Sequence, residues 1–237
     1  MSTAEVVVSV TALGKRFGVR PVLDDLSFEV VSGETLGLVG ANGGGKTTTL
    51  RLLAGLLRPD RGSGSFLGRP LCHPANRRHL GYMTQSNALY FDLSVAENLL
   101  FRAAVHGVGK ASVTDAIARY GIDAVQTQRV STLSGGWARR VEFVATVLHK
   151  PKLLLLDEPT AGLDIVTRRS MWQWMAALAG EGCTIIVSTH DLAEAGQCAN
   201  ILLYHEGKVR GPMTPDAALA ERGSPTLEDA VFAMAAK

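Results

Sequence analysis

TLGLVGANGGGKTTTL, residues 35–50, is the stretch of this chain that decides its fold. Its first five residues form an apolar strand pattern, and its end begins a helical spacing that runs to residue 57. Between them, residues 40–47 match the phosphate-loop pattern G-x-x-x-x-G-K-[ST]. Glycines let the backbone aim several N–H groups at phosphate oxygens, and the helix N-terminus adds its positive dipole. An ordinary glycine turn before a helix is the alternative, and the strand and helix on the two sides favour the phosphate loop.

The phosphate loop assigns a role to each of its polar side chains. Lys46 is expected to hold the β- and γ-phosphates of a nucleotide, and Thr47 is expected to ligate magnesium. The expected nucleotide-binding residues of the loop are Gly40, Ala41, Asn42, Gly43, Gly44, Gly45, Lys46, Thr47 and Thr48.

An Asp-Glu pair follows a second apolar run, the four leucines at 153–156. Ligands of open α/β sheets bind at the carboxyl ends of the strands, so Asp157 is expected to hold magnesium, directly or through water. Glu158 is then placed to polarise the attacking water as a general base. A solvated helix cap before Pro159 is the alternative for such a pair. The leucine run and the phosphate loop favour the catalytic interpretation.

Strand and helix patterns alternate along most of the chain, which predicts the α/β class with a parallel sheet covered on both faces. A long helical block lies between two sets of strands, so we expect it to project as a subdomain. The strand patterns are at residues 6–13, 26–31, 35–39, 153–156, 184–187 and 201–204, and the helical patterns are at 47–57, 94–150, 166–180 and 192–198.

Composition and charge narrow the class of protein. The 237 residues are 46% apolar, enough for a core, and 24 basic against 22 acidic residues give a net charge of +2. This balance provides no large field for nucleic acid, which is not an expected partner. Three cysteines without C-x-x-C spacing indicate reduced thiols rather than disulfides or zinc. No apolar run approaches the ~18 residues that span a bilayer, so a soluble, intracellular chain is expected.

The tetrad Leu133-Ser134-Gly135-Gly136 lies upstream of the leucine run. Together with the phosphate loop and the Asp-Glu pair, it makes nearly the whole chain resemble the ATP-binding subunit of an ABC transporter. The resemblance implies a P-loop NTPase (RecA-like) core with a parallel sheet, an N-terminal antiparallel β subdomain and an inserted helical subdomain. It also implies ATP and Mg²⁺ as cofactors. Ser134, Gly135 and Gly136 would open a helix and contact the γ-phosphate of the nucleotide bound by the opposite subunit, a role that suits a helix N-terminus with two glycines.

The same resemblance divides the chain within a single ABC ATPase domain, 1–237. Residues 1–91 and 151–213 are expected to form the β subdomain and the nucleotide-binding core. Residues 92–150 are the expected helical subdomain with the signature tetrad, and 214–237 the expected short C-terminal helical tail.

Four more residues receive roles from the resemblance alone. Gln85 matches the glutamine that senses magnesium and water, and His190 the histidine that hydrogen-bonds the γ-phosphate; both are therefore catalytic candidates beside Glu158. Asp164 matches a loop that crosses the dimer interface, and Phe17 the aromatic residue that stacks on adenine. Considered singly, a glutamine is usually a surface residue and a histidine at a strand end usually structural. A core aromatic between strands is the alternative for Phe17.

Two departures from the family pattern remove no phosphate-facing group. Trp137 stands where a glutamine usually closes the signature, which puts a side-chain contact from that position in doubt, and Ile165 stands where proline commonly follows the aspartate. Tryptophan at this place, and the ending at 226–232 that is similar to "LEDVF", resemble a subgroup that serves ABC-2 type exporters.

The expected function is therefore ATP hydrolysis by a dimer formed head to tail around two Mg-ATP. This hydrolysis would power a separate membrane permease of the ABC-2 exporter type, which exports drugs, small molecules or lipids. Expected partners are a second copy or a homologous subunit, an integral membrane permease that docks near residues 86–99, and a periplasmic adaptor; the expected location is the inner face of the cell membrane. A soluble ABC ATPase acting on nucleic acid, ribosomes or cofactor assembly remains the alternative. A phosphate-loop kinase or GTPase would explain Lys46 and Asp157 but has no use for Ser134-Gly135-Gly136.

Overall fold

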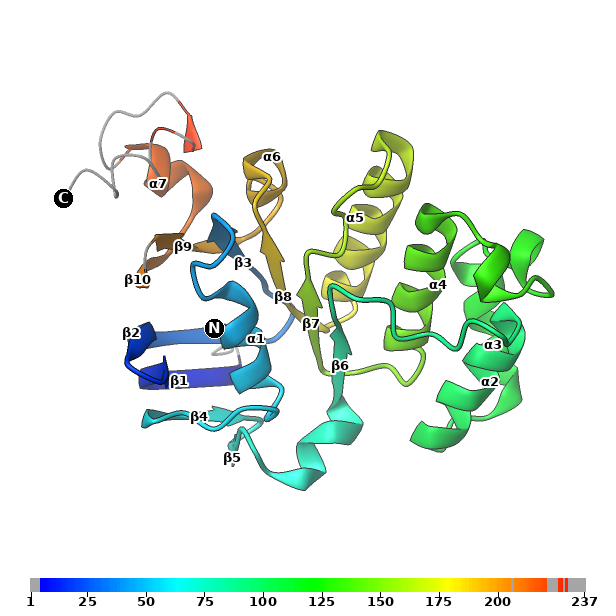
Figure 1. The fold of residues 1–237 in the computed structure, drawn as a ribbon, viewed down its shortest axis with the longest axis horizontal. Coiled ribbons are helices and arrows are strands. Elements are labelled where there is room, and N and C mark those ends of the chain that lie inside the picture. Colours follow the sequence, from blue (N-terminus) through cyan, green and yellow to red (C-terminus); the bar gives the residue numbers. More distant parts are fainter. Residues whose placement is uncertain (1–4, 206, 221–225, 228, 230–237) are drawn as a thin grey trace.

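The centre of the molecule is a six-stranded sheet with the strand order β10-β9-β3-β8-β7-β6 (Figure 1). The computed structural model describes residues 5–205, 207–220, 226, 227 and 229. Strands β3, β6, β7, β8 and β9 run parallel to their neighbours, so their carboxyl ends meet at one edge, and β10 is antiparallel to β9. The strands are β3 Thr35–Gly40, β6 Leu80–Met83, β7 Leu153–Asp157, β8 Thr184–Thr189, β9 Asn200–His205 and β10 Lys208–Met213.

A second, four-stranded antiparallel sheet has the order β2-β1-β4-β5 and lies at the end of the molecule away from the helical block (Figure 1). Its first hairpin is longer than the two expected strands, because β1 continues beyond Ala12 through register shifts that interrupt the alternation of apolar residues. Ala12 itself has a φ of 51°. The strands are β1 Val6–Phe17, β2 Arg20–Val31, β4 Arg61–Phe66 and β5 Arg69–Pro70.

Two apolar clusters cover the two faces of the central sheet. Alternate residues along each strand face opposite sides. Leu153 and Leu155 of β7 pack in the cluster that includes the antiparallel sheet and the first helix, α1. Leu154 and Leu156 pack on the other face, against the later helices. The four leucines are fully buried, so β7 is packed on both faces. This packing fixes the position of the strand end, where Asp157 and Glu158 follow.

Helix α1, Lys46–Leu53, ends four residues before the expected residue 57. Gly55 has a φ of 69°, the left-handed conformation that ends helices, and the Leu56 N–H donates to the Arg51 carbonyl at 2.9 Å. The apolar spacing continues into Leu56, which is 65% exposed, and this is why the sequence predicted a longer helix.

The helical block lies between β6 and β7 and forms the other end of the molecule (Figure 1). Its first helix starts at a capping box, in which Ser94 and Glu97 satisfy each other's backbone N–H groups. Its last helix starts at Ser134, whose hydroxyl accepts the Trp137 N–H at 3.4 Å. The helices of the block are α2 Val95–His106, α3 Lys110–Arg119 and α4 Gly135–Val147, and short 3-10 turns at Asp123–Val125 and Val130–Thr132 connect α3 to α4.

The remaining helices link the parallel strands and follow the last one. Helix α5, Ile165–Gly180, agrees with the helical pattern, whereas α6, Leu192–Ala195, ends before the expected residue 198 because Gly196 follows it. Helix α7, Pro215–Ala220, occupies the start of the expected tail. The ending at 226–232, which is similar to "LEDVF", lies mostly outside the described residues. Within the described ranges, no helix is long and apolar enough to cross a membrane.

Candidate functional site

The phosphate loop joins β3 to α1 in a conformation that only glycine adopts readily. Gly40 and Gly45 have φ values of 148° and 111°, and a Cβ on Gly40 would lie 2.2 Å from the Tyr204 carbonyl oxygen. The loop therefore winds tightly over β9. Lys46 is buried and folds back over the loop, where its Nζ donates to the carbonyls of Gly40 at 2.5 Å and Ala41 at 3.1 Å.

The buried carboxylate of Asp157 connects the ends of three elements. Its Oδ1 accepts the hydroxyl of Thr47 at 3.1 Å and that of Ser188, from β8, at 2.7 Å. Thr47 and Asp157 supply the hard oxygen ligands that Mg²⁺ prefers, and adjacent ligands of an octahedral Mg²⁺ lie about 2.9 Å apart. The observed separation of 3.1 Å between Thr47 Oγ1 and Asp157 Oδ1 fits such a pair.

Glu158 follows with a φ of 47°, unusual for a residue with a side chain. Its N–H donates to the hydroxyl of Ser188 at 3.0 Å, which fixes this turn to β8. Its Oε1 lies 3.7 Å from Lys46 Nζ, and its Oε2 lies 3.4 Å from His190 Nδ1. Burial lowers the pKa of Lys46, and the charges of Glu158 and Asp157 partly oppose this effect.

A cavity of about 590 Å³ lies over this arrangement. It brings Phe17 and Gln85 to the phosphate loop, although they are far apart in sequence. Phe17 is half exposed, so it is not a core aromatic between strands. Gln85 is exposed. The lining residues are Phe17, Arg20, Val22, Asn42, Gly43, Gly45, Lys46, Thr47, Thr48, Gln85 and Glu158.

Ser134 and Asp164 line a different cavity, of about 410 Å³. Gly136 also lines it, and a Cβ there would find only Thr167 Oγ1 within 4 Å, at 3.9 Å; a Cβ on Gly135 would find nothing that close. The start of α4 is therefore open to close approach of a ligand. Of the described residues, none lines both this cavity and the one over the phosphate loop. One chain thus does not bring Ser134 to Lys46.

Asp164 caps α5 in the second cavity. It accepts the N–H groups of Val166 and Thr167 at 3.0 Å and the Thr167 hydroxyl at 2.7 Å. These hydrogen bonds lower the pKa of the Asp164 carboxyl, Thr167 contributing most. Ile165, the departure from proline, is the first residue of α5 and is 83% exposed.

Trp137 lies over a cation rather than offering a polar group in place of glutamine. The Arg140 guanidinium lies 4.4 Å from the centroid of its ring and 5.1 Å from that of Trp174. The tryptophan also packs against the apolar cluster of the helical block. Trp137 therefore contributes a cation–π contact near the beginning of α4 where the family pattern has a polar side chain.

Two polar residues of this region were not predicted. Ser188 holds both Asp157 and the backbone of Glu158, and its position at the end of an apolar strand was the available signal. Arg139 donates hydrogen bonds to the backbone carbonyls of Thr84 and Asp157. Most of its targets are backbone carbonyls, which no side-chain pattern reveals.

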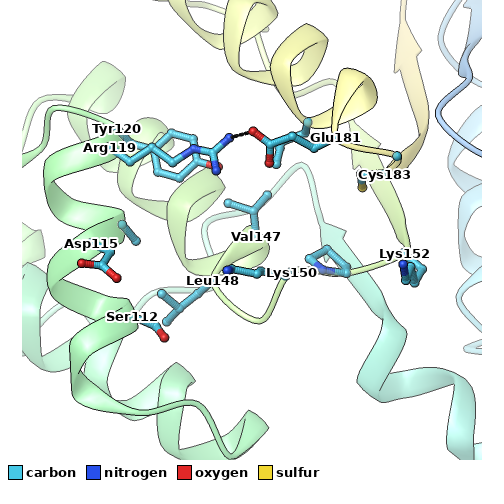
Figure 2. Close-up of a pocket in the computed structure, with 14 residues that line it drawn as sticks. Ser112, Asp115, Arg119, Tyr120, Val147, Leu148, Lys150, Lys152, Glu181 and Cys183 are labelled. Carbon is cyan, nitrogen blue, oxygen red and sulfur yellow. Dashed lines mark hydrogen bonds and ion pairs between the residues drawn. The ribbon is translucent and has the colours of Figure 1, made fainter.

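A third cavity, of about 370 Å³, lies between α3, the end of α4 and the end of α5 (Figure 2). An ion pair between Arg119 and Glu181, 2.5 Å apart, crosses from α3 to α5 at this place. Burial raises the pKa of the Cys183 thiol on its wall to about 12. None of the predicted site residues is among the described residues that line it.

Comparison with known proteins gives consistent matches over most of the chain. The sequence profile of the ABC transporter family matches residues 23–161. The chain is 36% identical to a probable multidrug ABC transporter ATP-binding protein, YbhF, of Escherichia coli over 95% of its own length, but it spans only 41% of that relative. It is 35% identical to the Nod factor export ATP-binding protein I of Paraburkholderia xenovorans, covering 94% of this chain and 76% of the relative.

Solved structures of ATP-binding subunits have the same fold. An ATP-binding subunit of an ABC transporter superposes with a TM-score of 0.88 at 28% identity, over 97% of this chain and 99% of the other. The cbiO1 protein of Clostridium perfringens, described as part of the transporter complex cbiONQ, gives a TM-score of 0.81 at 27% identity, over 92% of each chain.

Proposed function

The chain belongs to the ABC transporter family of ATP-binding proteins, whose members hydrolyse ATP, and from this premise we propose that it is the ATPase subunit of a transporter. In the proposed reaction, Lys46 and the loop amides hold the phosphates of ATP, and Thr47 and Asp157 hold Mg²⁺. Bound Mg²⁺ neutralises phosphate charge. Glu158 accepts the proton of the attacking water, His190 contacts the γ-phosphate, Gln85 senses the metal and water, and Phe17 stacks on the adenine.

The division of the site between two cavities carries the proposal of a dimer. Lys46 and Glu158 line one cavity, whereas Ser134 and Asp164 line the other. A second copy, or a homologous subunit, placed head to tail would bring its Ser134 over the phosphate loop of the first. Ile165 and Val166, 83% and 75% exposed beside Asp164, would then be covered. ATP held between the phosphate loop of one copy and Ser134 of the other favours the closed dimer, and hydrolysis lets the two copies separate.

An exposed apolar patch supports docking to a membrane permease. The patch consists of Tyr90, Phe91, Phe101 and Val105, which are 44–62% exposed. The rings of Tyr90 and Phe101 meet edge to face with centroids 5.0 Å apart, which gives the patch a fixed shape. It includes part of the stretch 86–99 and extends along α2. A short apolar helix of the permease would bury these side chains.

Export is the proposed direction of transport, because the Nod factor relative is named for export and the YbhF relative is named as a multidrug transporter protein. A location on the inner face of the membrane follows from docking to the permease, and a periplasmic adaptor would complete such an exporter. Recovery of an integral membrane protein with the chain from detergent-solubilised membranes tests these partners. Salt-sensitive retention on nucleic acid, without a membrane protein, would instead favour the soluble alternative.

Glu158→Gln tests the catalytic assignment. The variant keeps the shape of the side chain and removes the base, so we expect it to bind ATP and to slow hydrolysis by roughly 10²- to 10⁴-fold. Because the closed pair then persists, ATP should convert monomer to dimer in light scattering. Normal turnover by this variant would remove Glu158 from the role of base. Failure to form a dimer with ATP would contradict the head-to-tail arrangement.

A further inference from the structure

Arg139 makes an unusually large set of contacts with the catalytic segments. It lies on α4, five residues after Ser134, and its guanidinium donates to five backbone carbonyls. The shortest of these hydrogen bonds reaches the carbonyl of Thr84, at 2.7 Å. The carbonyls of Glu158, Asp157, Pro159 and Gln85 lie at 3.0, 3.1, 3.2 and 3.4 Å.

A buried carboxylate fixes the guanidinium in this place. Glu142, one turn further along α4, is 3% exposed, and its Oε2 accepts Arg139 Nη1 at 2.9 Å. Its other oxygen accepts the N–H of Ala88 at 3.1 Å. Burial raises the pKa of the Glu142 carboxyl, and Arg139 opposes the effect. Burial of such a pair adds little stability, so its value lies in the geometry that it fixes.

The peptide units around Glu158 are held from two directions. Ser188 accepts the Glu158 N–H at 3.0 Å, and Arg139 donates to the Glu158 carbonyl at 3.0 Å. Glu158 itself is in a left-handed conformation, with a φ of 47°. Such a conformation persists only where the surroundings fix it. Loss of Arg139 would free the carbonyl side of the turn and let the carboxylate change its position.

We propose that Arg139 is a positioning residue that transmits movement of α4 to Glu158 and to the Thr84-Gln85 segment. The inference rests on the proposed dimer, in which the partner's nucleotide contacts Ser134 at the start of α4. Displacement of that helix then moves the carbonyls at the chain's own catalytic site. The occupancy of one site thereby sets the geometry of the other.

The far end of α4 leaves room for such movement. Val147 and Leu148 border the cavity of about 370 Å³ between α3 and α5 (Figure 2). The helix is thus tied to the core by the hydrogen bonds of Arg139, whereas its far end borders a cavity. The Arg119–Glu181 ion pair at that cavity is partly exposed and offers a matched control.

Arg139→Met, with Arg119→Met as its control, tests the inference. We expect Arg139→Met to keep the KM for ATP within about threefold and to lower kcat by roughly 10- to 100-fold, as for a small misplacement of a catalytic group. The Hill coefficient of ATP hydrolysis should fall toward 1. Arg119→Met should retain the kcat and the Hill coefficient of the parent, since exposed ion pairs contribute little.

Two further variants keep the test decisive if the single variant folds poorly. Arg139→Met combined with Glu142→Met removes both charges of the pair, which commonly preserves folding, and it should show the same loss of kcat and cooperativity. Arg139→Lys should restore only part of kcat, because one ammonium cannot reach the two loops at once. A double variant with parental kcat and Hill coefficient would overturn the inference while the proposed function stands. A parent without ATP-dependent dimerisation or ATPase activity would instead overturn the proposed function.

Discussion

Two inactive variants, Lys46→Ala and Ser134→Arg, are expected to regain ATPase activity when they are mixed. Lys46 is the buried cation of the phosphate loop, and Ser134 opens α4 at the other cavity. If each nucleotide lies between Lys46 of one copy and Ser134 of the other, the mixed dimer has one intact site. Its second site contains both lesions. Neither variant alone can form an intact site.

The arrangement sets the size of the recovery. Random pairing of equal amounts makes about half of the dimers mixed, and half of their sites are intact, so about a quarter of all sites are restored. Ser134→Arg also removes the hydroxyl that caps α4, at a cost of about 1 kcal/mol, which the fold should tolerate. Ser134→Ala is the control for loss of the cap without the bulk and charge of arginine.

Phosphate release, measured while the mixing ratio is varied, is the assay. Activity should be greatest at equal amounts and vanish at both ends. The control is a chain with both Lys46→Ala and Ser134→Arg, mixed in equal amounts with the parent. If the sites are shared between copies, only about a quarter of them stay intact. If each chain contained a complete site, about half would stay intact. A mixture as inactive as its components, formed from folded chains that pair, would refute the division of the site between two copies.

Two simpler measurements test the electrostatics of the described structure. Burial raises the pKa of the thiols of Cys183 and Cys198 to about 12. At pH 8 a native chain should therefore take up one alkylating group, at the exposed Cys72, as measured by intact-mass spectra. Labelling at either buried thiol would contradict that burial. The lowered pKa of Asp164, caused mainly by its hydrogen bonds with Thr167, stabilises the fold above the ordinary pKa of an aspartate, and the contribution disappears as the pH falls through the lowered value. Asp164→Asn should therefore lower the melting temperature at pH 7 more than at pH 2, and an equal difference at both pH values would exclude this contribution.

Local patterns predicted the parts of the fold in which the residues themselves determine the structure. The phosphate loop needs its glycines, and the leucines of β7 are buried on both faces, so both were recognisable in sequence. Strand β4 was missed because Arg61–Phe66 is mostly small and polar, and it becomes a strand only by pairing with β1. Short β6, Leu80–Met83, similarly takes its conformation from β7.

The same distinction explains which features of the candidate site could be predicted. Lys46 and Asp157 carry their chemistry in side chains at positions that a motif marks. Arg139 acts on backbone carbonyls of two segments far from it in sequence, and only the packing of α4 brings them together. The separation of the two cavities is likewise a property of the folded chain.

The contact between Lys46 and Glu158 has a consequence for nucleotide binding. The Lys46 ammonium lies 3.7 Å from the carboxylate proposed as the base and donates to two carbonyls of its own loop. Phosphate oxygens that enter the loop would compete for this cation and draw it from the carboxylate. Substrate binding would then exchange one anionic neighbour of Lys46 for another, and the same exchange would leave Glu158 available to water. With the proposed roles, binding of ATP would itself free the base that activates the attacking water.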